Sequence, residues 1–173
     1  MIVGVPRETF PGERRAALVP SAASTLIGAG HRVLVEKGLG EAAGFPDAAY
    51  LEKGAEVREN RPEVFEADAI LQVRGYGANP EAGRADLDRM RPGQLLVAFL
   101  DPLSEPERVK ELAERGVRAI AMETIPRISR AQSMDALSSM ATVDGYKAVL
   151  LAAAASPRMF PMLMTAAGTV MPA

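Results

Sequence analysis

One segment, residues 126–140, gathers the polar side chains best suited to binding a ligand. It holds two arginines, a glutamine, an aspartate and four serines, which are Arg127, Arg130, Gln132, Asp135, Ser129, Ser133, Ser138 and Ser139. Arginine donates paired hydrogen bonds to phosphate or carboxylate, and the free N–H groups at a helix start suit a nucleotide's phosphates. An exposed loop with Ser133 as the N-cap of the next helix would account for the serines and the aspartate. It accounts less easily for two arginines and a glutamine together, so the segment favours a loop that binds the phosphates, ribose hydroxyls and carboxamide of a nucleotide.

Two further arginines, Arg14 and Arg15, follow the first expected strand. In a parallel sheet they would lie at the carboxyl edge, where binding crevices form. They could clamp a carboxylate or phosphate, or an arginine here could pair with Glu13 in an ordinary surface ion pair. The sequence leaves these two alternatives equal.

Residues 38–43, Gly-Leu-Gly-Glu-Ala-Ala, match the form G-x-G-x-x-A and follow an expected strand. A dinucleotide fingerprint needs a long helix that starts there and points its N-terminus at the pyrophosphate. Gly44 and Pro46 would break that helix within a turn, so the motif predicts a structural turn. His31 and Asp101-Pro102 are also interpreted as turn residues.

Composition excludes several classes of function. The chain has 173 residues, no cysteine and one histidine, which excludes disulfides, thiolate catalysis and cysteine-ligated zinc and disfavours a catalytic triad or multi-histidine metal site. Its 20 basic and 22 acidic side chains give a net charge of −2, without the basic patch that nucleic acid or an anionic membrane attracts. No apolar run reaches the roughly 18 residues of a spanning helix, and the first residues do not resemble a signal peptide. We therefore expect a cytosolic protein without a metal site, a nucleic-acid partner or a membrane-inserted segment.

Short β-branched runs alternate with helical patterns along the first 133 residues. Strands are expected at residues 2–5, 32–36, 69–73, 95–100 and 117–121. Helices are expected from Ser21 to Gly28, from Pro46 to Leu51, and from a Ser104/Glu107 capping box to Gly116. Strands separated by such helices predict right-handed crossovers and an α/β fold with a doubly wound, mostly parallel sheet of five strands. The continuously apolar run at 95–100 predicts a strand covered on both faces.

The pattern changes after residue 133. Residues 134–155 form one long helical pattern rich in alanine, serine and methionine, and residues 159–173 are apolar and nearly uncharged, without a strand pattern. We therefore expect an α/β domain at 1–133. We expect a connecting helix and an apolar tail at 134–173, which would lead to a partner domain outside this sequence.

The candidate loop resembles a known family. Residues 126–135, Pro-Arg-Ile-Ser-Arg-Ala-Gln-Ser-Met-Asp, followed by Leu137-Ser138-Ser139, are similar to the signature loop of the NAD(H)-binding component of proton-translocating NAD(P) transhydrogenase. The stretches 4–8, 13–17 and 160–170 agree with that family, and the resemblance runs in register through the whole chain. Alanine dehydrogenases resemble the chain in fold and in the N-terminal motif but not in this loop.

The resemblance implies the Rossmann-like or flavodoxin-like N-terminal domain of the alanine dehydrogenase/transhydrogenase family. It implies hydride transfer between NADH and NADP⁺, which membrane partners couple to proton translocation. The implied cofactor-binding residues are Arg127, Ile128, Ser129, Arg130, Gln132, Asp135 and Ser138. Gln132 and Asp135 are the implied catalytic residues. Gln132 would lie at the face where the two dinucleotides meet, and Asp135 would orient the loop and the ribose together with Ser138.

The same resemblance implies partners. Another component would bind NADP(H), membrane-spanning components would place the protein on the cytoplasmic face of a bacterial inner membrane, and the chain would form a homodimer. In the family, a strand and a G-x-G-x-x-G motif follow the equivalent of residues 170–173. The adenosine and pyrophosphate half of the site is therefore expected outside this sequence, and the chain alone is expected to be inactive.

Two other functions stay open. Alanine dehydrogenases carry a substrate-binding lysine where this chain has Arg74 and a catalytic histidine where it has Asp101, although their carboxylate-binding arginine is present as Arg15. Oxidative deamination needs an acid/base group tuned near neutrality, and an aspartate is a poor substitute. The third function is that of a non-catalytic dimerisation or docking domain that supplies its loop to another protein's site.

Overall fold

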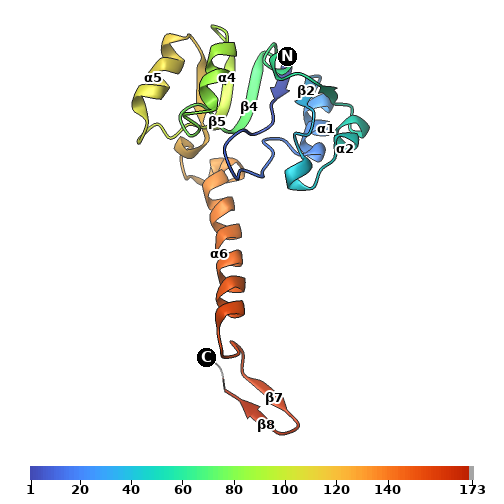
Figure 1. Cartoon of the computed structure of the whole chain (residues 1–173), viewed down its shortest axis with the longest axis vertical. Helices are drawn as coiled ribbons and strands as arrows, with labels where there is room; N and C mark the ends of the chain where they lie inside the picture. The colour runs from blue at the N-terminus through green and yellow to red at the C-terminus, as the bar shows by residue number, and fades with distance from the viewer. Residues whose placement is uncertain (172–173) are drawn as a thin grey trace. The chain divides into compact units, whose positions relative to one another are not determined.

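The computed structural model describes residues 1–171 and divides into two compact units, Met1–Ile125 and Pro126–Ala173 (Figure 1). The segment predicted to bind a ligand belongs to the second unit.

The first unit is built on one sheet of six strands in the order β3-β2-β1-β4-β5-β6. The strands are β1 (Ile2–Val5), β2 (Arg32–Glu36), β3 (Glu56–Arg58), β4 (Ala69–Arg74), β5 (Leu95–Phe99) and β6 (Arg118–Ala121). Every neighbouring pair is parallel, which confirms the predicted doubly wound α/β fold. The strand order reverses between β1 and β4, so the chain leaves these two strands in opposite directions at the carboxyl edge.

The predicted number of strands is wrong by one, because β3 gives no sequence signal. It has only three residues, with Val57 between Glu56 and Arg58. A run this short shows no clear alternation of apolar and polar residues. Its pairing with β2, rather than its own pattern, makes it a strand.

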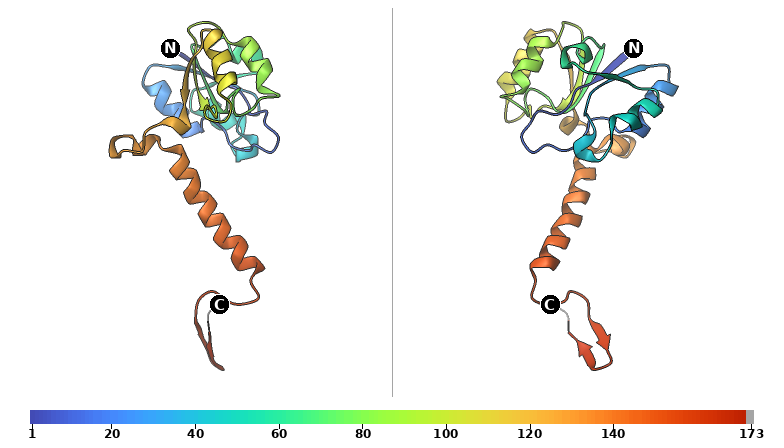
Figure 2. Two further views of the ribbon diagram at one scale, coloured as in Figure 1. Left: turned by 90° about the vertical axis from the view of Figure 1, so that its left-hand side faces the viewer. Right: turned by 45° about the vertical axis from the view of Figure 1, so that its right-hand side comes forward.

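Helices cover the two faces of the sheet at different places. They are α1 (Pro20–Gly28), α2 (Asp47–Glu52), α3 (Arg61–Val64), α4 (Gly83–Arg89) and α5 (Pro106–Glu114). α1 and α2 lie on one side of the sheet and α4 and α5 on the other (Figures 1 and 2). Val5, Val35 and Tyr50 belong to the buried cluster on the first side, and Leu96 and Leu112 to the cluster on the second.

Proline, rather than the expected serines, marks two helix starts. α1 begins at Pro20 and α5 at Pro106, and neither N-cap side chain accepts a hydrogen bond from a helix N–H. Proline fits the first helical position because its φ is already helical and its missing N–H would have no partner there. Ser21 therefore lies inside α1 and Ser104 lies before the N-cap of α5, so the predicted capping box is wrong.

The expectation that β5 is covered on both faces is also wrong for the described residues. Leu96 and Ala98 are buried, whereas Leu95, Val97 and Phe99 on the other face are only half-buried. The reason is the placement of the helices: α4 and α5 cover one face of β5, and α1 and α2 cover the opposite face of the sheet at β1 and β2.

The second unit contains a 3-10 helix (Ser129–Met134), the long helix α6 (Ala136–Ala155), and the antiparallel strands β7 (Leu163–Thr165) and β8 (Gly168–Val170). The prediction of a tail without strands is wrong. Each strand has only three residues, too few for a detectable alternation. Pro172 and Ala173, which complete the predicted tail, lie outside the described residues. Within residues 1–171, no helix combines the length and hydropathy that crossing a membrane requires.

Candidate functional site

Asp135 organises the start of α6. Its Oδ1 accepts a hydrogen bond from the Ser138 N–H at 2.9 Å, and its Oδ2 accepts one from Ser138 Oγ at 2.6 Å. Ser139 Oγ donates to the Asp135 carbonyl oxygen at 2.9 Å. The side-chain and then the backbone hydrogen bond of Ser138, with the nearby charge of Arg127, lower the pKa of Asp135. Asp135 is therefore the N-cap of α6, and the interpretation of Ser133 as the cap is wrong.

The remaining polar side chains of the loop are unpartnered. Within residues 1–171, the side chains of Ser129, Arg130 and Gln132 form no hydrogen bond or ion pair, and Arg127 interacts only through its charge with Asp135. All four are exposed. Two guanidinium groups and an amide with unused donors and acceptors could form hydrogen bonds with a polar or anionic ligand.

The structure brings only some of the predicted site residues together. Asp135 and Ser138 hydrogen-bond through their side chains, while the others share the loop without side-chain hydrogen bonds to one another. Ile128 is 55% exposed and offers an apolar surface beside them. In the described part of the chain, no group of histidine, aspartate and glutamate side chains could hold a metal ion.

Glu13 decides between the alternatives left open for the arginines of the first unit. Its Oε1 accepts from Arg15 Nε at 2.7 Å, and its Oε2 accepts from Arg15 Nη2 at 2.6 Å and from Arg74 Nε at 3.0 Å. The Glu13 side chain is only 6% exposed, and its hydrogen bond with Arg15 is the main cause that lowers its pKa to about 2. Arg15 therefore pairs with Glu13, and Arg14 instead donates from Nε to the Ala42 carbonyl oxygen at 3.4 Å.

Glu8 fastens the same loop to the sheet. Its carboxylate accepts the N–H groups of Val73 at 2.6 Å and of Arg74 at 3.1 Å. Burial raises the pKa of Glu8, although these two hydrogen bonds oppose the shift. Glu8 and Glu13 thus tie the chain that leaves β1 to the end of β4.

A largely buried ionic network at this edge is not visible in the sequence. Arg61 donates to Asp86 Oδ1 at 2.7 Å and to Glu36 Oε2 at 2.6 Å, and also to the Arg7 carbonyl oxygen at 2.7 Å. Gln72 Nε2 donates to Asp86 Oδ2 at 2.9 Å. Burial acts to lower the pKa of Arg61, but Asp86 and Glu36 together outweigh it and raise that pKa. These residues lie far apart in sequence, and no local spacing connects them.

The glycine motif at 38–43 forms a turn. A 3-10 helix of three residues, Glu41–Ala43, ends at Gly44 in the left-handed conformation, with φ 86°. The Gly38 N–H donates to Asp47 Oδ1 at 2.9 Å. The prediction of a structural turn is confirmed, because no long helix begins at the motif.

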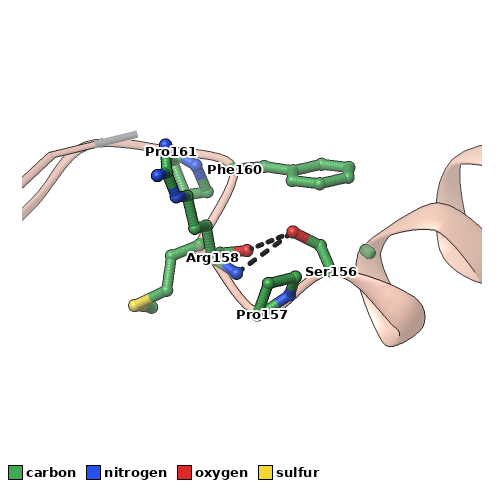
Figure 3. A pocket seen from close by; sticks show the side chains of 7 residues that line it. Ser156, Pro157, Arg158, Phe160 and Pro161 are labelled. Atoms are coloured by element: carbon green, nitrogen blue, oxygen red, sulfur yellow. Dashed lines mark hydrogen bonds between the residues drawn. The ribbon is translucent and has the colours of Figure 1, made fainter. Parts of the chain in front are cut away.

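A hollow of about 350 Å³ lies within the second unit, lined by Ala153 and residues 156–161. Ser156 Oγ donates to the Arg158 carbonyl oxygen and accepts from the Arg158 N–H (Figure 3). These polar groups satisfy one another within the turn after α6, and none of the predicted site residues lines the hollow.

Comparison with known proteins gives a consistent assignment. The family model "Alanine dehydrogenase/PNT, N-terminal domain" matches residues 4–144. The chain is 45% identical over 174 aligned positions to NAD(P) transhydrogenase subunit alpha of Cereibacter sphaeroides, covering all of this chain and 32% of that protein. It is 37% identical to the alanine dehydrogenase of Bacillus subtilis (strain 168), covering 88% of this chain and 38% of that protein.

Solved structures agree. The transhydrogenase of Sinorhizobium meliloti superposes with a TM-score of 0.89 at 40% identity, covering all of this chain and 50% of that chain. The chain thus spans between a third and a half of the length of these relatives. By its sequence and its fold, the chain belongs to the alanine dehydrogenase/PNT family and corresponds to the N-terminal domain of the family's proteins.

Proposed function

We propose that this chain is the N-terminal part of the NAD(H)-binding component of a proton-translocating NAD(P) transhydrogenase. The observation that carries the proposal is the loop 127–135. The side chains of its two arginines and its glutamine have no hydrogen-bond partner among the described residues, while Asp135 fixes the following helix. A loop held at one end with unused polar groups at the other is preorganised for a polar ligand.

Each loop residue has a proposed role toward NAD(H). Arg127 and Arg130 would hold its polar groups, with Ile128 and Ser129 between them, and Gln132 would lie where the two dinucleotides meet. Asp135 and Ser138 would keep the loop and the ribose in position. Bound NADH supplies the hydride for NADP⁺, and the protein contributes binding and orientation. A neutral amide at Gln132 suits this place, because a fixed charge beside a transferring hydride would bias the equilibrium.

The proposal includes the parts of the enzyme outside this chain. The region that the longer relatives carry would supply the adenosine and pyrophosphate half of the site, and a separate component would bind NADP(H). Membrane-spanning components would couple hydride transfer to proton movement and place the assembly on the cytoplasmic face of the membrane. The chain would act as a homodimer and would bind NAD(H) only weakly alone.

Gln132→Ala and Arg127→Ala test these roles in the complete transhydrogenase. We expect Gln132→Ala to slow hydride transfer about a hundredfold while the dissociation constant of NADH changes less than about threefold, because its contact matters chiefly in the transition state. Arg127→Ala should raise that dissociation constant about tenfold through the lost charge-assisted hydrogen bond. Stopped-flow transfer rates and NADH fluorescence titration measure the two effects.

Asp144→Ala is the matched control, since Asp144 is an exposed acid in α6 without a hydrogen bond or ion pair in the described residues. It should alter neither quantity. An unchanged transfer rate for Gln132→Ala, with weaker NADH binding, would assign Gln132 to binding alone.

The alanine dehydrogenase alternative is less well supported by the geometry. Arg15 and Arg74 both bind the Glu13 carboxylate, and Asp101, which follows β5, stands where the alanine dehydrogenases carry their catalytic histidine. We expect no NADH formation when the complete protein is given L-alanine and NAD⁺. Measurable turnover in that assay would favour the amino-acid reaction.

A further inference from the structure

A hollow of about 510 Å³ lies in the first unit, at the edge of the sheet where β4, β5 and β6 begin. Its lining residues are Asp68, Arg91, Pro92, Gly93, Gln94 and Arg118. They lie in the turns just before the strands or at the first residue of a strand, so the hollow is at the amino edge of the sheet. Its volume is within the range of small-molecule binding sites.

Gln94 makes the turn beside the hollow rigid. Its side chain is almost completely buried, and its Nε2 donates to the carbonyl oxygens of Phe65 at 2.8 Å and Ala67 at 2.6 Å. Its Oε1 accepts the Arg91 N–H at 3.1 Å, and its own N–H donates to the Arg91 carbonyl oxygen at 3.1 Å. Gly93 allows this turn through its positive φ of 81°. The backbone that carries Arg91 is therefore held in place before any ligand binds.

Backbone carbonyl groups, and not carboxylates, hold both arginines of the hollow. Arg91 donates from Nη2 to the carbonyl oxygens of Glu66 at 2.6 Å and Ala67 at 3.2 Å. Arg118 donates from Nε at 3.1 Å and from Nη2 at 2.9 Å to the Gly93 carbonyl oxygen. A carbonyl group orients a guanidinium without cancelling its charge. In the described part of the chain neither arginine forms an ion pair, and each keeps unused N–H donors.

The charges around the hollow are unbalanced. Asp68 is the only acidic residue among those that line it, and its Oδ2 already accepts the Ile2 N–H at 2.7 Å. Two guanidinium groups therefore face one carboxylate. Arg115 adds a further positive charge nearby, since it donates to the carbonyl oxygens of Asp88 and Met90, just before the turn.

The fold, and not a local motif, brings the two arginines together. Arg91 lies in the turn before β5, and Arg118 is the first residue of β6. The parallel pairing of these strands places Arg118 beside Leu95. Because the net charge of the whole chain is −2, composition gives no sign of this local excess of positive charge.

We propose that this hollow, the Arg91–Arg118 hollow, binds a phosphate group, which either a soluble phosphorylated molecule or a phospholipid headgroup could carry. A guanidinium forms paired hydrogen bonds with phosphate oxygens. Two guanidinium groups from different elements need an anion with more than two acceptor oxygens, which favours phosphate over a single carboxylate. The proposal goes beyond the proposed function and does not depend on it, since the hollow and the loop 127–135 belong to different units.

Calorimetric titration of the 173-residue chain with inorganic pyrophosphate tests the proposal. The ionic strength is kept constant with sodium chloride, because salt screens exposed charges. We expect saturable binding at one site. Arg91→Ala and Arg118→Ala should each weaken this binding about tenfold through the loss of charge-assisted hydrogen bonds.

Asp68→Asn provides a test that does not depend on a loss of binding. It removes the only carboxylate that lines the hollow, while the asparagine amide oxygen can still accept the Ile2 N–H. We expect it to tighten pyrophosphate binding about threefold, a gain that damage to the fold cannot produce. Lys53→Ala is the matched control, because Lys53 is exposed and its side chain has no hydrogen bond or ion pair among the described residues. It should change the affinity less than about twofold.

Three results would overturn the proposal. The first is the absence of saturable binding, and the second is an equal loss of affinity in Lys53→Ala, which would show a general attraction to positive charge. The third is a loss in Arg127→Ala without one in Arg91→Ala, which would place the anion at the loop 127–135.

Vesicles containing phosphatidylglycerol distinguish the two sources of the phosphate. Binding to these vesicles that pyrophosphate displaces and Arg91→Ala weakens would identify a phospholipid headgroup. Pyrophosphate binding without vesicle binding would identify a soluble phosphorylated molecule. Vesicle binding that neither pyrophosphate nor Arg91→Ala affects, in a chain that does not bind pyrophosphate, would contradict the proposal.

Discussion

At the scale of single residues, two half-buried carboxylates help to fix the loop at the carboxyl edge of the sheet. Glu8 holds the N–H groups at the end of β4, and Glu13 joins Arg15 to Arg74. Because Glu13 is almost buried, its ion pairs are weakly screened by water. The loop after β1 should therefore depend on the charge state of Glu13.

We predict that Glu13→Gln destabilises the chain by about 2 kcal/mol at pH 7, the cost of losing charge-assisted hydrogen bonds. The folded-state pKa of Glu13 is about 2, below its ordinary value of 4.5. Its contribution is therefore complete above pH 4.5 and disappears as the pH falls towards 2. Urea unfolding of the wild type and the variant should give curves that differ at pH 7 and converge as the pH approaches 2.

Glu59→Gln is the control for this prediction, because Glu59 pairs with Lys37 at the surface and its side chain is 70% exposed. Its effect should stay below about 0.5 kcal/mol at every pH. A difference between wild type and Glu13→Gln that persists unchanged at pH 2 would show that packing, and not charge, holds the loop.

At the scale of elements, close backbone contact fixes the connection between β4 and α4. A Cβ on Gly77 would lie 1.6 Å from the Leu100 carbonyl oxygen, at the end of β5, and so no side chain fits there. We predict that Gly77→Ala destabilises the chain by about 3 kcal/mol through overpacking. Gly145→Ala is the matched control.

Gly145 lies inside α6 with no atom near its missing Cβ, and alanine there should increase helicity, with a gain of up to about 1 kcal/mol. Thermal unfolding followed by circular dichroism measures both variants. A neutral Gly77→Ala would show that the connection can move away from β5.

The N-cap of α6 gives a second prediction at this scale. Asp135→Ala removes the acceptor of the Ser138 N–H and Oγ–H, whereas asparagine is a good N-cap. We therefore expect faster hydrogen exchange at the Ser138 and Ser139 amides in Asp135→Ala and little change in Asp135→Asn. Asp144→Ala should leave these amides unchanged, and equal exchange in Asp135→Ala and wild type would contradict the capping role.

The elements also show what could be predicted from the sequence. The five strands with apolar runs were predictable, because burial of apolar residues dominates their formation. The long helix was predictable from its alanine-rich composition, because alanine has the highest helix propensity. β3 and the β7–β8 pair were not, because strands of three residues depend on their partners. The candidate loop could be found from its crowded polar residues, but the cap at Asp135 instead of Ser133 depends on where the helix begins. Arg61 and Asp86 meet only through the fold, and no sequence pattern places them together.

At the scale of the whole molecule, the two units differ in how they bury apolar residues. The first unit has two buried clusters, whereas no residue of α6 is buried. Val149, Leu150 and Leu151 are 57%, 46% and 58% exposed. A helix that is apolar on every side is normally buried in a larger core, so α6 requires a partner beyond its own unit.

We predict that the chain self-associates through α6, as a symmetric dimer in the simplest case. Sedimentation velocity over about a hundredfold range of concentration should show a shift from monomer to dimer, as mass action requires. Leu150→Glu combined with Leu151→Glu should move this shift to higher concentration, because the carboxylates would have to be buried at the contact. Leu51→Glu, at a leucine of α2 that is 55% exposed, should not move it. If the double variant dimerises as the wild type does, another surface carries the contact, and α6 must then be covered by the part of the polypeptide that the longer relatives possess.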